Sequence, residues 1–429
     1  MAFQQGLSGL NSASKALDVT SNNIANASTV GYKASVTHFG DVYASSLAGA
    51  GASQVGIGNS VAAIQQQFTQ GNLTSTNNPL DISINGAGFF KMDNNGATTY
   101  SRNGQFHLDK NGYIVNDQAL KLTGYAAQSG IIVPSTPAAI QISASDLPPI
   151  ETGTSTSAGF TGVKANLQLD SRVSVPTVTP WVGATGPLYT PDPQSYSYST
   201  ALSVYDSLGN PHALTMYFVK TATPGQWQTH FNVDGTSDAY VTPQGTNMTF
   251  DSAGKLTSTP VALSINLASV NAALSLPSNA SSPMAFNVDF TGTTQFGSAF
   301  GTNRLEQDGY AAGHLVGLSV GSDGVIQGRY SNGQTFAQGQ IVMANFTNPN
   351  GLQSLGNNQW TETSVSGPAL IGAPNTSNLG ILSSSTVEES NVDLTAELVN
   401  LITQQRNYQA NAQSIKTQDQ IMQTLVNLR

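Results

Sequence analysis

The sequence predicts a multidomain protein that combines all-β inner and outer domains with a discontinuous α-helical coiled-coil domain made from paired N- and C-terminal helices. Two observations carry this prediction. Apolar residues recur with heptad spacing at both ends of the chain, and short apolar runs separated by glycine-containing turns fill the interior. The length of 429 residues is typical of about three domains.

The N-terminal part of the coiled-coil domain is expected over residues 1–30. Spacings of four and three residues alternate there along a mostly apolar stripe, which is the pattern of a heptad seam. The seam residues are Phe3, Leu7, Leu10, Leu17 and Ile24. Because Gly6 and Gly9 each cost about 1 kcal/mol relative to alanine, this helix needs a partner to be stable.

The C-terminal part covers residues 390–429, with a helix from about 392 to near 427. Its seam residues are Leu394, Leu398, Leu401, Tyr408, Ile415 and Met422. Ser390 or Asn391 is the expected N-cap, and Asp393 in the first turn is favoured by the helix dipole. Both end segments are net neutral. They can therefore pack within one chain or between copies of it, and the sequence leaves both arrangements open.

The interior is predicted to be β structure interrupted by an insertion. Residues 71–146 and 285–347 are expected to form one inner β domain, with residues 147–284 inserted as an outer β domain. Residues 31–70 and 348–389 are rich in Gly, Ser and Asn and are expected to be connectors. Hairpin turns are expected at Asn94–Gly96, Arg102–Gly104, Lys110–Gly112, Asp206–Asn210, Ser322–Gly324 and Ser331–Gly333.

The composition narrows the classes of function. Charged residues make up 9% of the chain, against roughly 25% in an average soluble protein. The net charge is −9 and no basic run reaches five residues, so no nucleic-acid partner is expected. Sparse charge suits a surface that packs against many copies of itself. The chain has no cysteine, which excludes disulfides, thiolate metal sites and a cysteine nucleophile.

The first residues lack the basic and apolar regions of a secretory signal peptide. No run approaches the 18 consecutive apolar residues that would indicate a membrane span. If the protein is exported, we therefore expect a route that does not depend on a signal peptide.

No set of residues predicts an active site, so we expect neither an enzyme nor a cofactor. The five histidines are scattered without metal-ligand spacing: His38, His107, His212, His230 and His314. The stretch Gly317–Gly321 matches G-x-S-x-G, but a turn and a second strand are expected after it in place of the helix that a serine nucleophile needs. Asp109–Tyr113 (DKNGY) fits a β-turn better than a calcium loop.

Two stretches carry a resemblance to a known family. SNNIANASTVGYK at residues 21–33 resembles the signature of the flagellar rod and hook protein family, and residues 390–429 resemble the other end of the same family. The motif residues are Asn22, Asn23, Ile24, Ala25, Asn26, Gly31 and Tyr32. Three features favour the hook branch over the rod branch. They are the room for an inserted domain, the inner-domain-like stretches 100–116 and 120–125, and the outer-domain-like stretch 204–220.

The resemblance implies a structural subunit of the bacterial flagellar hook. Copies would polymerise into a curved, flexible tube that transmits torque from rod to filament, with the terminal helices as its inner layer. The implied partners are other copies of the chain, the distal rod, the hook–filament junction proteins, the hook cap and the flagellar export apparatus. The implied location is the hook, outside the cell. The least family-like parts are residues 126–200 and 235–285.

The asparagines of the motif are unusual because asparagine competes with helical backbone hydrogen bonds. We expect Asn22, Asn23 and Asn26 to point away from the seam, to satisfy the last helical carbonyls and to bond a neighbouring subunit. An intramolecular cap alone is the alternative. Gly31 is expected to adopt the left-handed conformation that turns the chain outward.

Three competing interpretations remain open at this point. A distal rod protein would lack the large insertion. A secreted β-rich adhesin or surface-layer protein would fit the Ser-, Thr- and Asn-rich composition, but it does not need uncharged heptad helices at both ends. A peptidoglycan hydrolase fused to a flagellar protein would need a catalytic set that the residues do not supply.

Overall fold

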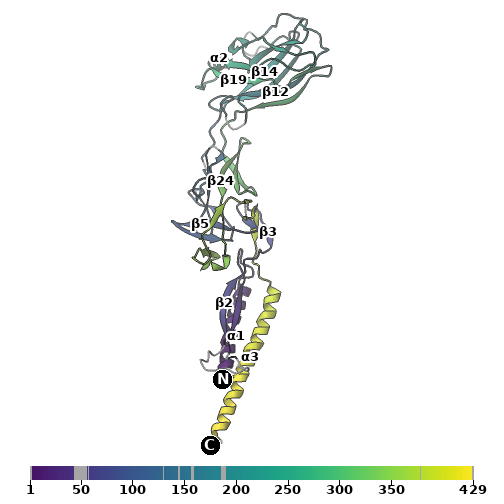
Figure 1. Ribbon diagram of the computed structural model, residues 1–429. Coiled ribbons are helices and arrows are strands. Elements are labelled where there is room, and N and C mark those ends of the chain that lie inside the picture. The colour runs from purple at the N-terminus through teal and green to yellow at the C-terminus, as the bar shows by residue number, and fades with distance from the viewer. Residues whose placement is uncertain are drawn as a thin grey trace. The chain divides into compact units, whose positions relative to one another are not determined.

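The computed structural model describes residues 2–42, 56, 58–128, 130–143, 145–155, 159–184, 190–376 and 378–427. The chain divides into two compact units (Figure 1). The first unit comprises Met1–Ala144, Val316–Arg329 and Thr335–Arg429, and the second comprises Ser145–Leu315 and Tyr330–Gln334. The described residues are mostly β, with three α-helices: α1 (Ala2–Ala25), α2 (Leu267–Leu274) and α3 (Leu394–Asn427).

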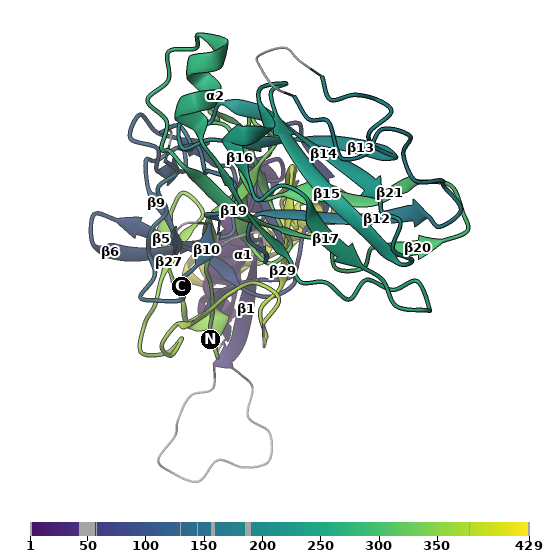
Figure 2. The ribbon, with the colours of Figure 1, turned by 90° about the horizontal axis from the view of Figure 1, so that it is seen from above.

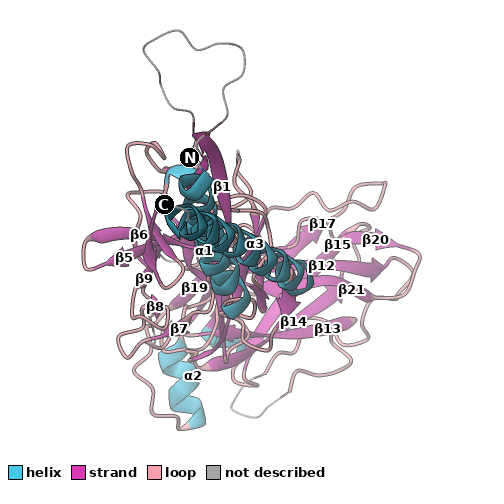
Figure 3. Cartoon of the chain, turned by 90° about the horizontal axis from the view of Figure 1, so that it is seen from below, coloured by secondary structure: helices cyan, strands magenta, loops and turns pink. Residues whose placement is uncertain are grey.

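The two terminal helices lie side by side in the first unit, as Figures 1 and 3 show. A two-stranded antiparallel hairpin of β1 (Ser35–Val42) and β2 (Gly58–Gln66) packs against α1. The expectation that residues 31–70 form only a connector was therefore wrong. Gly, Ser and Asn predict loops locally, but here the strands are stabilised by their pairing with each other and by contact with α1.

One large sheet follows in the first unit, with strand order β22-β23-β24-β9-β5-β6-β27-β26. These strands are β22 (Leu315–Val320), β23 (Val325–Tyr330), β24 (Thr335–Ile341), β9 (Lys121–Gln128), β5 (Phe89–Asn94), β6 (Ala97–Ser101), β27 (Gln359–Thr361) and β26 (Gln353–Gly356). Six shorter strands extend it: β7 (His107–Leu108), β8 (Ile114–Val115), β10 (Ile131–Ile132), β11 (Ala138–Ala139), β25 (Met343–Asn345) and β28 (Leu370–Gly372). Because β24 pairs with β9, the segments before and after the insertion share one sheet.

The second predicted connector, residues 348–389, also contains strands. Besides β26, β27 and β28, it supplies β29 (Ile381–Ser384), which pairs with β4 (Ile82–Asn85), and β30 (Thr386–Glu388), which pairs with β3 (Leu73–Ser75). The C-terminal segment is thus paired with strands from the first third of the chain. Beside the large sheet, the rings of Phe68, Phe89, Phe346 and Trp360 pack edge to face.

Five of the six predicted turns connect neighbouring strands. At Asn95–Gly96, for example, both residues have positive φ, 50° and 97°, and the flanking residues Asn94 and Ala97 are paired. The turn predicted at Arg102–Gly104 was wrong. Gly104 instead crosses β4 so closely that an added Cβ would lie 1.6 Å from the carbonyl oxygen of Ile82, a long-range contact that the local sequence does not reveal.

The second unit contains two sheets. The first is a six-stranded sheet of β16 (Val241–Thr242), β18 (Val261–Ile265), β19 (Met284–Asp289), β12 (Val163–Asp170), β20 (Thr294–Phe296) and β21 (Gly301–Gln307). The other is a four-stranded sheet of β13 (Tyr198–Tyr205), β14 (Pro211–Lys220), β15 (Gln226–Val233) and β17 (Thr246–Thr249), seen in Figure 2. Side chains from both sheets form one apolar core that includes Leu167, Phe218, Trp227 and Val288.

Two expectations about the inserted domain need correction. Its predicted end at residue 284 is too early, because β19, β20 and β21 all join the sheet of β12 and the unit continues to Leu315. The domain is also not entirely β, since it contains the helix α2, whose N-cap Asn266 accepts a hydrogen bond from the Ser269 amide.

Candidate functional site

The terminal helices pack antiparallel through a stripe of small residues on α1. A Cβ added at Gly6 would lie 2.9 Å from Ile415 Cγ1, and one added at Gly9 would lie 2.8 Å from Asn411 Oδ1. The buried residues of α1 are Gly6, Ser12, Ala13, Ala16, Thr20 and Asn23. Most of them repeat at spacings of three and four residues, so α1 carries a second heptad stripe, one residue before the predicted seam. Absent or small side chains let α3 approach closely.

The predicted seam of α1 is partly exposed. Phe3 and Leu7 are 52% and 42% exposed, and Leu10, Leu17 and Ile24 are half-buried. Whether the seam as a whole pairs within one chain or between copies therefore stays a prediction. The small stripe permits the close approach of α3 at Gly6 and Gly9, whereas Phe3 and Leu7 of the seam remain open to solvent.

The predicted seam of α3 is split in the same way. Leu401 and Ile415 are half-buried, and Ile415 packs against Gly6 of α1. The exposed members are Leu394, Leu398, Tyr408 and Met422. Near the start of α3, Leu394 and Leu398 join two further apolar residues, Val399 and Ile402. These four residues are between 46% and 58% exposed, and we call them the α3 patch.

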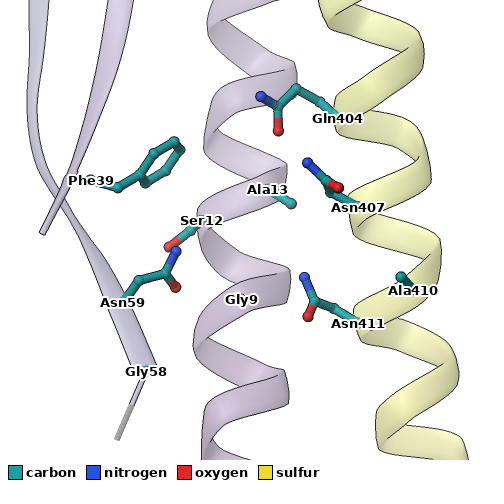
Figure 4. Close-up of a pocket in the computed structure, with 10 residues that line it drawn as sticks. All are labelled: Gly9, Ser12, Ala13, Phe39, Gly58, Asn59, Gln404, Asn407, Ala410 and Asn411. Atoms are coloured by element: carbon teal, nitrogen blue, oxygen red, sulfur yellow. The ribbon is translucent and has the colours of Figure 1, made fainter. Parts of the chain in front are cut away.

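A polar cavity of about 500 Å³ lies beside the helix pair and the β1–β2 hairpin (Figure 4). Carboxamides dominate its lining, with Asn59 from β2 and Gln404, Asn407 and Asn411 from α3. Gly9, Ser12 and Ala13 lie on α1, which Figure 4 shows between the hairpin and α3, and Phe39, Gly58 and Ala410 also line the cavity. These amides offer both donors and acceptors without charge.

Asn23 of the family motif is 1% exposed and its side chain is fully occupied within the chain. Its Nδ2 donates to the Ser35 carbonyl oxygen at 2.8 Å and to Glu397 Oε1 at 3.2 Å. Its Oδ1 accepts from the Ser35 amide at 2.9 Å and from the Tyr32 hydroxyl at 3.2 Å. The expectation that Asn23 bonds a neighbouring subunit is therefore wrong: it links α1, β1 and α3 of one chain.

The other motif residues end the helix. Asn26 Nδ2 donates to the carbonyl oxygen and to Oδ1 of Asn22, and Asn26 Oδ1 accepts from the Thr29 hydroxyl. Ala25 is exposed and Ile24 half-buried. Gly31 has the expected left-handed φ of 71°, and an added Cβ there would lie 2.7 Å from the Asn103 backbone nitrogen.

A buried cluster of three charged side chains follows the motif. Glu388 accepts hydrogen bonds from Lys33 Nζ at 2.7 Å and Arg102 Nη1 at 3.3 Å, and no side chain of the three is more than 4% exposed. Burial lowers the pKa of Lys33, and the charge of Glu388 partly offsets this. Sequence reasoning missed the cluster, which we call the buried charge cluster. The sequence carries no local signal for it, because its three residues lie far apart in the chain.

Asn391 also joins distant segments. Its Nδ2 donates to the Gln67 carbonyl oxygen at 2.7 Å, and its Oδ1 accepts from the Ala34 amide at 2.7 Å. It is therefore not the N-cap of α3. Asp393 has that role, because its Oδ1 accepts from the amides of Thr395 and Ala396.

The stretches that resembled catalytic or metal sites have structural roles. Gly317–Gly321 runs through β22 into a turn and then β23, so Ser319 is not on a strand-to-helix turn. Asp109 Oδ1 accepts from the amides of Asn111 and Tyr113, as in an ordinary β-turn. Among the described residues, no group of His, Asp and Glu side chains is placed to hold a metal ion. No helix in that part of the chain is both long and apolar enough to cross a membrane.

Four family models match the chain. They are "Flagella basal body rod protein" at residues 3–33, "Flagellar hook protein FlgE/F/G D1 domain" at 83–145, "Flagellar basal body protein FlaE D2 domain" at 166–310 and "Flagellar basal body rod FlgEFG protein C-terminal" at 383–428. The first and last cover the two terminal helices, and the third falls within the second unit.

Full-length relatives support the same assignment. The chain is 42% identical to the flagellar hook protein FlgE of Escherichia coli (strain K12) and 41% identical to that of Salmonella typhimurium, in each case over 100% of both chains. The crystal structure of Helicobacter pylori flagellar hook protein FlgE2 is similar in fold, with a TM-score of 0.50 at 12% identity over 74% of this chain and 99% of that one. The chain belongs to the flagellar hook protein family, whose members are structural proteins and not enzymes.

Proposed function

We propose that the chain polymerises with copies of itself, through the sides of its paired terminal helices, into the curved tube of the flagellar hook. The observation that carries this proposal is the exposed apolar surface of α1 and α3. Phe3 and Leu7 on α1 and the α3 patch are large side chains that the chain itself leaves open to solvent. Gathered on helices that already have an intrachain partner, they are typical of a protein–protein interface.

The energetics favour association with other copies. Burying a Leu or Ile side chain contributes roughly 1.5–3 kcal/mol, and each subunit would offer several. The helices carry few charges, so copies can approach without strong repulsion. In this arrangement the seam residues form a coiled-coil layer between subunits, while the small stripe holds each pair together.

The remaining partners and the location follow from the family. We propose that the polymer begins on the distal rod, grows beneath a hook cap and ends at the hook–filament junction proteins. Subunits would reach this place outside the cell through the flagellar export apparatus, by a route independent of a signal peptide. In the assembled hook they would pass torque from rod to filament.

A double substitution in the α3 patch tests the interface. Leu398→Ser with Ile402→Ser removes two exposed apolar side chains, so the monomer should unfold at the same denaturant concentration. The protein concentration needed for polymer formation, measured by sedimentation, should rise roughly 100-fold, for about 3 kcal/mol of lost burial. Ile131→Ser, at an exposed apolar site away from the helices, is the control. Unchanged polymerisation of the double variant would remove the α3 patch from the interface.

Electron microscopy of the concentrated wild-type protein tests the kind of polymer. Curved tubes are expected. Straight tubes would instead favour a rod protein, which is the nearest alternative within the flagellar axis. If the folded, intact chain formed no polymer even on an added hook nucleus, self-assembly itself would be contradicted.

A further inference from the structure

The buried charge cluster joins three segments that are far apart in the sequence. Lys33 follows the family motif, Arg102 follows β6, and Glu388 ends β30, just before α3. Each oxygen of the Glu388 carboxylate faces a different cation, Oε1 with Lys33 and Oε2 with Arg102. The Glu388 carboxylate lies on the segment that leads into α3. It therefore links that segment to the segment that leaves α1, through Lys33, and to the end of β6 in the large sheet, through Arg102.

The same side chains also hold backbone groups. Glu388 Oε1 accepts from the Gly71 amide at 2.9 Å, Lys33 Nζ donates to the Thr69 carbonyl oxygen at 2.8 Å, and Arg102 Nη2 donates to the Gly86 carbonyl oxygen at 2.9 Å. The backbone carbonyl of Glu388 in turn accepts from the Gly31 amide at 2.8 Å. Every bond has a fixed direction, so these bonds form together only when the segments keep this arrangement; Arg102 Nε, by contrast, is buried without a hydrogen-bond partner.

Burying charged side chains costs free energy, because they lose their contacts with water. Removing ions from water costs several kcal/mol for each, and apolar side chains of similar volume often stabilise a protein as well or better. In some proteins, buried and directional ion pairs select one arrangement of the packed segments over several similar arrangements. A chain with so few charged residues has nevertheless placed three of them here.

We infer that Glu388, together with Lys33 and Arg102, is the positioning group that fixes one geometry between the terminal helices and the large sheet of the same unit. A load applied to the helices is then passed to the sheet without slippage at the joint. The mechanical part of this inference rests on the proposed function. The geometric part concerns the isolated chain and can be tested on its own.

The absence of native cysteine makes a distance measurement direct. Spin labels on Gln413→Cys in α3 and Thr98→Cys in β6, both exposed sites, report the placement of the helix on the sheet. In the full-length monomer the wild-type distance distribution is expected to be narrow. Glu388→Gln leaves two buried cations without an anion, and the distribution should broaden about twofold or more. Hydrogen exchange at the Gly31 and Gly71 amides should accelerate roughly tenfold or more.

Glu389→Gln is the matched control, because it makes the same chemical change one residue later at an exposed site. It should retain the wild-type distances and exchange rates. If Glu388→Gln remained folded with wild-type distances and exchange, the inference would be overturned. Unfolding of each variant by denaturant shows whether a loss of stability alone accounts for the change.

Two milder variants keep the test decisive if Glu388→Gln does not fold. Lys33→Met and Arg102→Met each leave one cation opposite Glu388, so each should fold and broaden the distribution less than full loss of the anion. Wild-type widths in both would count against the inference. Failure of the proposed function would give a different result. The wild-type chain would not polymerise, but its spin-label distance distribution would still be narrow and would still broaden in Glu388→Gln.

Discussion

Among single residues, Asn23 hydrogen-bonds the backbone of Ser35 with its side chain, as a neighbouring strand would do with its backbone. Its carboxamide pairs with both the amide and the carbonyl of Ser35, and it also reaches Glu397 on α3. A carboxamide is suited to this because it donates and accepts at once. The crowding of asparagine at the end of α1 therefore includes one residue that organises the fold and two, Asn22 and Asn26, that cap the helix.

Asn23→Ala should lower the free energy of unfolding of the monomer by about 2 kcal/mol, since it removes four hydrogen bonds and leaves the half-buried Ser35 backbone groups without the side chain they bond. Urea unfolding followed by the helical circular dichroism signal measures this. Gln4→Ala, at an exposed site of the same helix, should change it by less than about 0.5 kcal/mol. A monomer of normal stability that fails to polymerise would instead return Asn23 to a role between subunits.

Two histidines give the second unit opposite responses to pH. Burial lowers the pKa of His230 to about 4, below the value of about 6.5 in an unfolded chain. Between these values the unfolded state binds the proton preferentially, so stability should fall by about 2 kcal/mol as the pH drops from about 6.5 to 4. In His230→Phe this loss should disappear, as measured by unfolding across that range. An equal loss in the variant would assign it to carboxyl groups.

His212 acts with the other sign. The Asp234 carboxylate, 2.6 Å from Nδ1, raises the pKa of His212, and Asp206 on its other side adds to this effect. Its contribution is complete below about pH 6.5 and is lost as the pH rises through the raised value. His212→Asn should remove this alkaline-side loss of stability, measured by unfolding of the same unit. Persistence of the loss in the variant would exclude His212 as its source.

At the scale of elements, α1 carries two heptad stripes with separate roles. The local pattern predicted the helix, which is present, and an apolar seam whose partner stays a prediction. It did not predict which stripe faces α3, because small residues give a weak apolar signal although they allow the closest packing. The turns behave similarly. Asn95–Gly96 was predictable because its strands pair with each other, whereas the contact of Gly104 with Ile82 depends on residues more than twenty positions away.

Enlarging the small stripe should separate the helices. Gly6→Val with Gly9→Val would place side chains within the space now occupied by Ile415 and Asn411, and overpacking of this kind costs roughly 1–3 kcal/mol per site. Hydrogen exchange along α1 should accelerate in the monomer. Asn11→Val, on the exposed side of the same helix, is the control. Slow exchange in the double variant would show that α3 can shift without loss of pairing.

At the scale of the whole molecule, the family motif and the nested order of segments were predictable from sequence, but the limits of the inserted unit were not. Its last three strands begin at or after the predicted end at residue 284 and are recognisable through long-range pairing, with β12 for all three and also with β18 for β19. The buried charge cluster was also beyond reach, because it joins positions more than three hundred residues apart. Local patterns predict elements, whereas partners at long range decide domain limits and buried polar sites.

The corrected limits show where most of the inserted unit can be deleted from the chain. Leu147 and Gly313 are paired through hydrogen bonds of 2.7 and 3.1 Å, so a short Gly-Ser linker can replace residues 148–312. The remaining chain should fold and polymerise, and electron microscopy should show a straighter tube, because the inserted unit is expected to supply the contacts that set curvature. A tube of normal curvature would contradict that role. A variant that lacks only residues 147–284 should fail to fold, because β19, β20 and β21 would remain without their partner β12.

The antiparallel pairing of α1 with α3 also bears on the order in which the chain can acquire its structure. α1 comes from the first residues and α3 from the last, while the second unit lies almost entirely within one continuous stretch of chain. A chain that emerges from its N-terminus can therefore complete the second unit before α3 has appeared, but α1 must wait for α3. The helix pair therefore forms only once α3 is available, and a chain cut before α3 cannot form it.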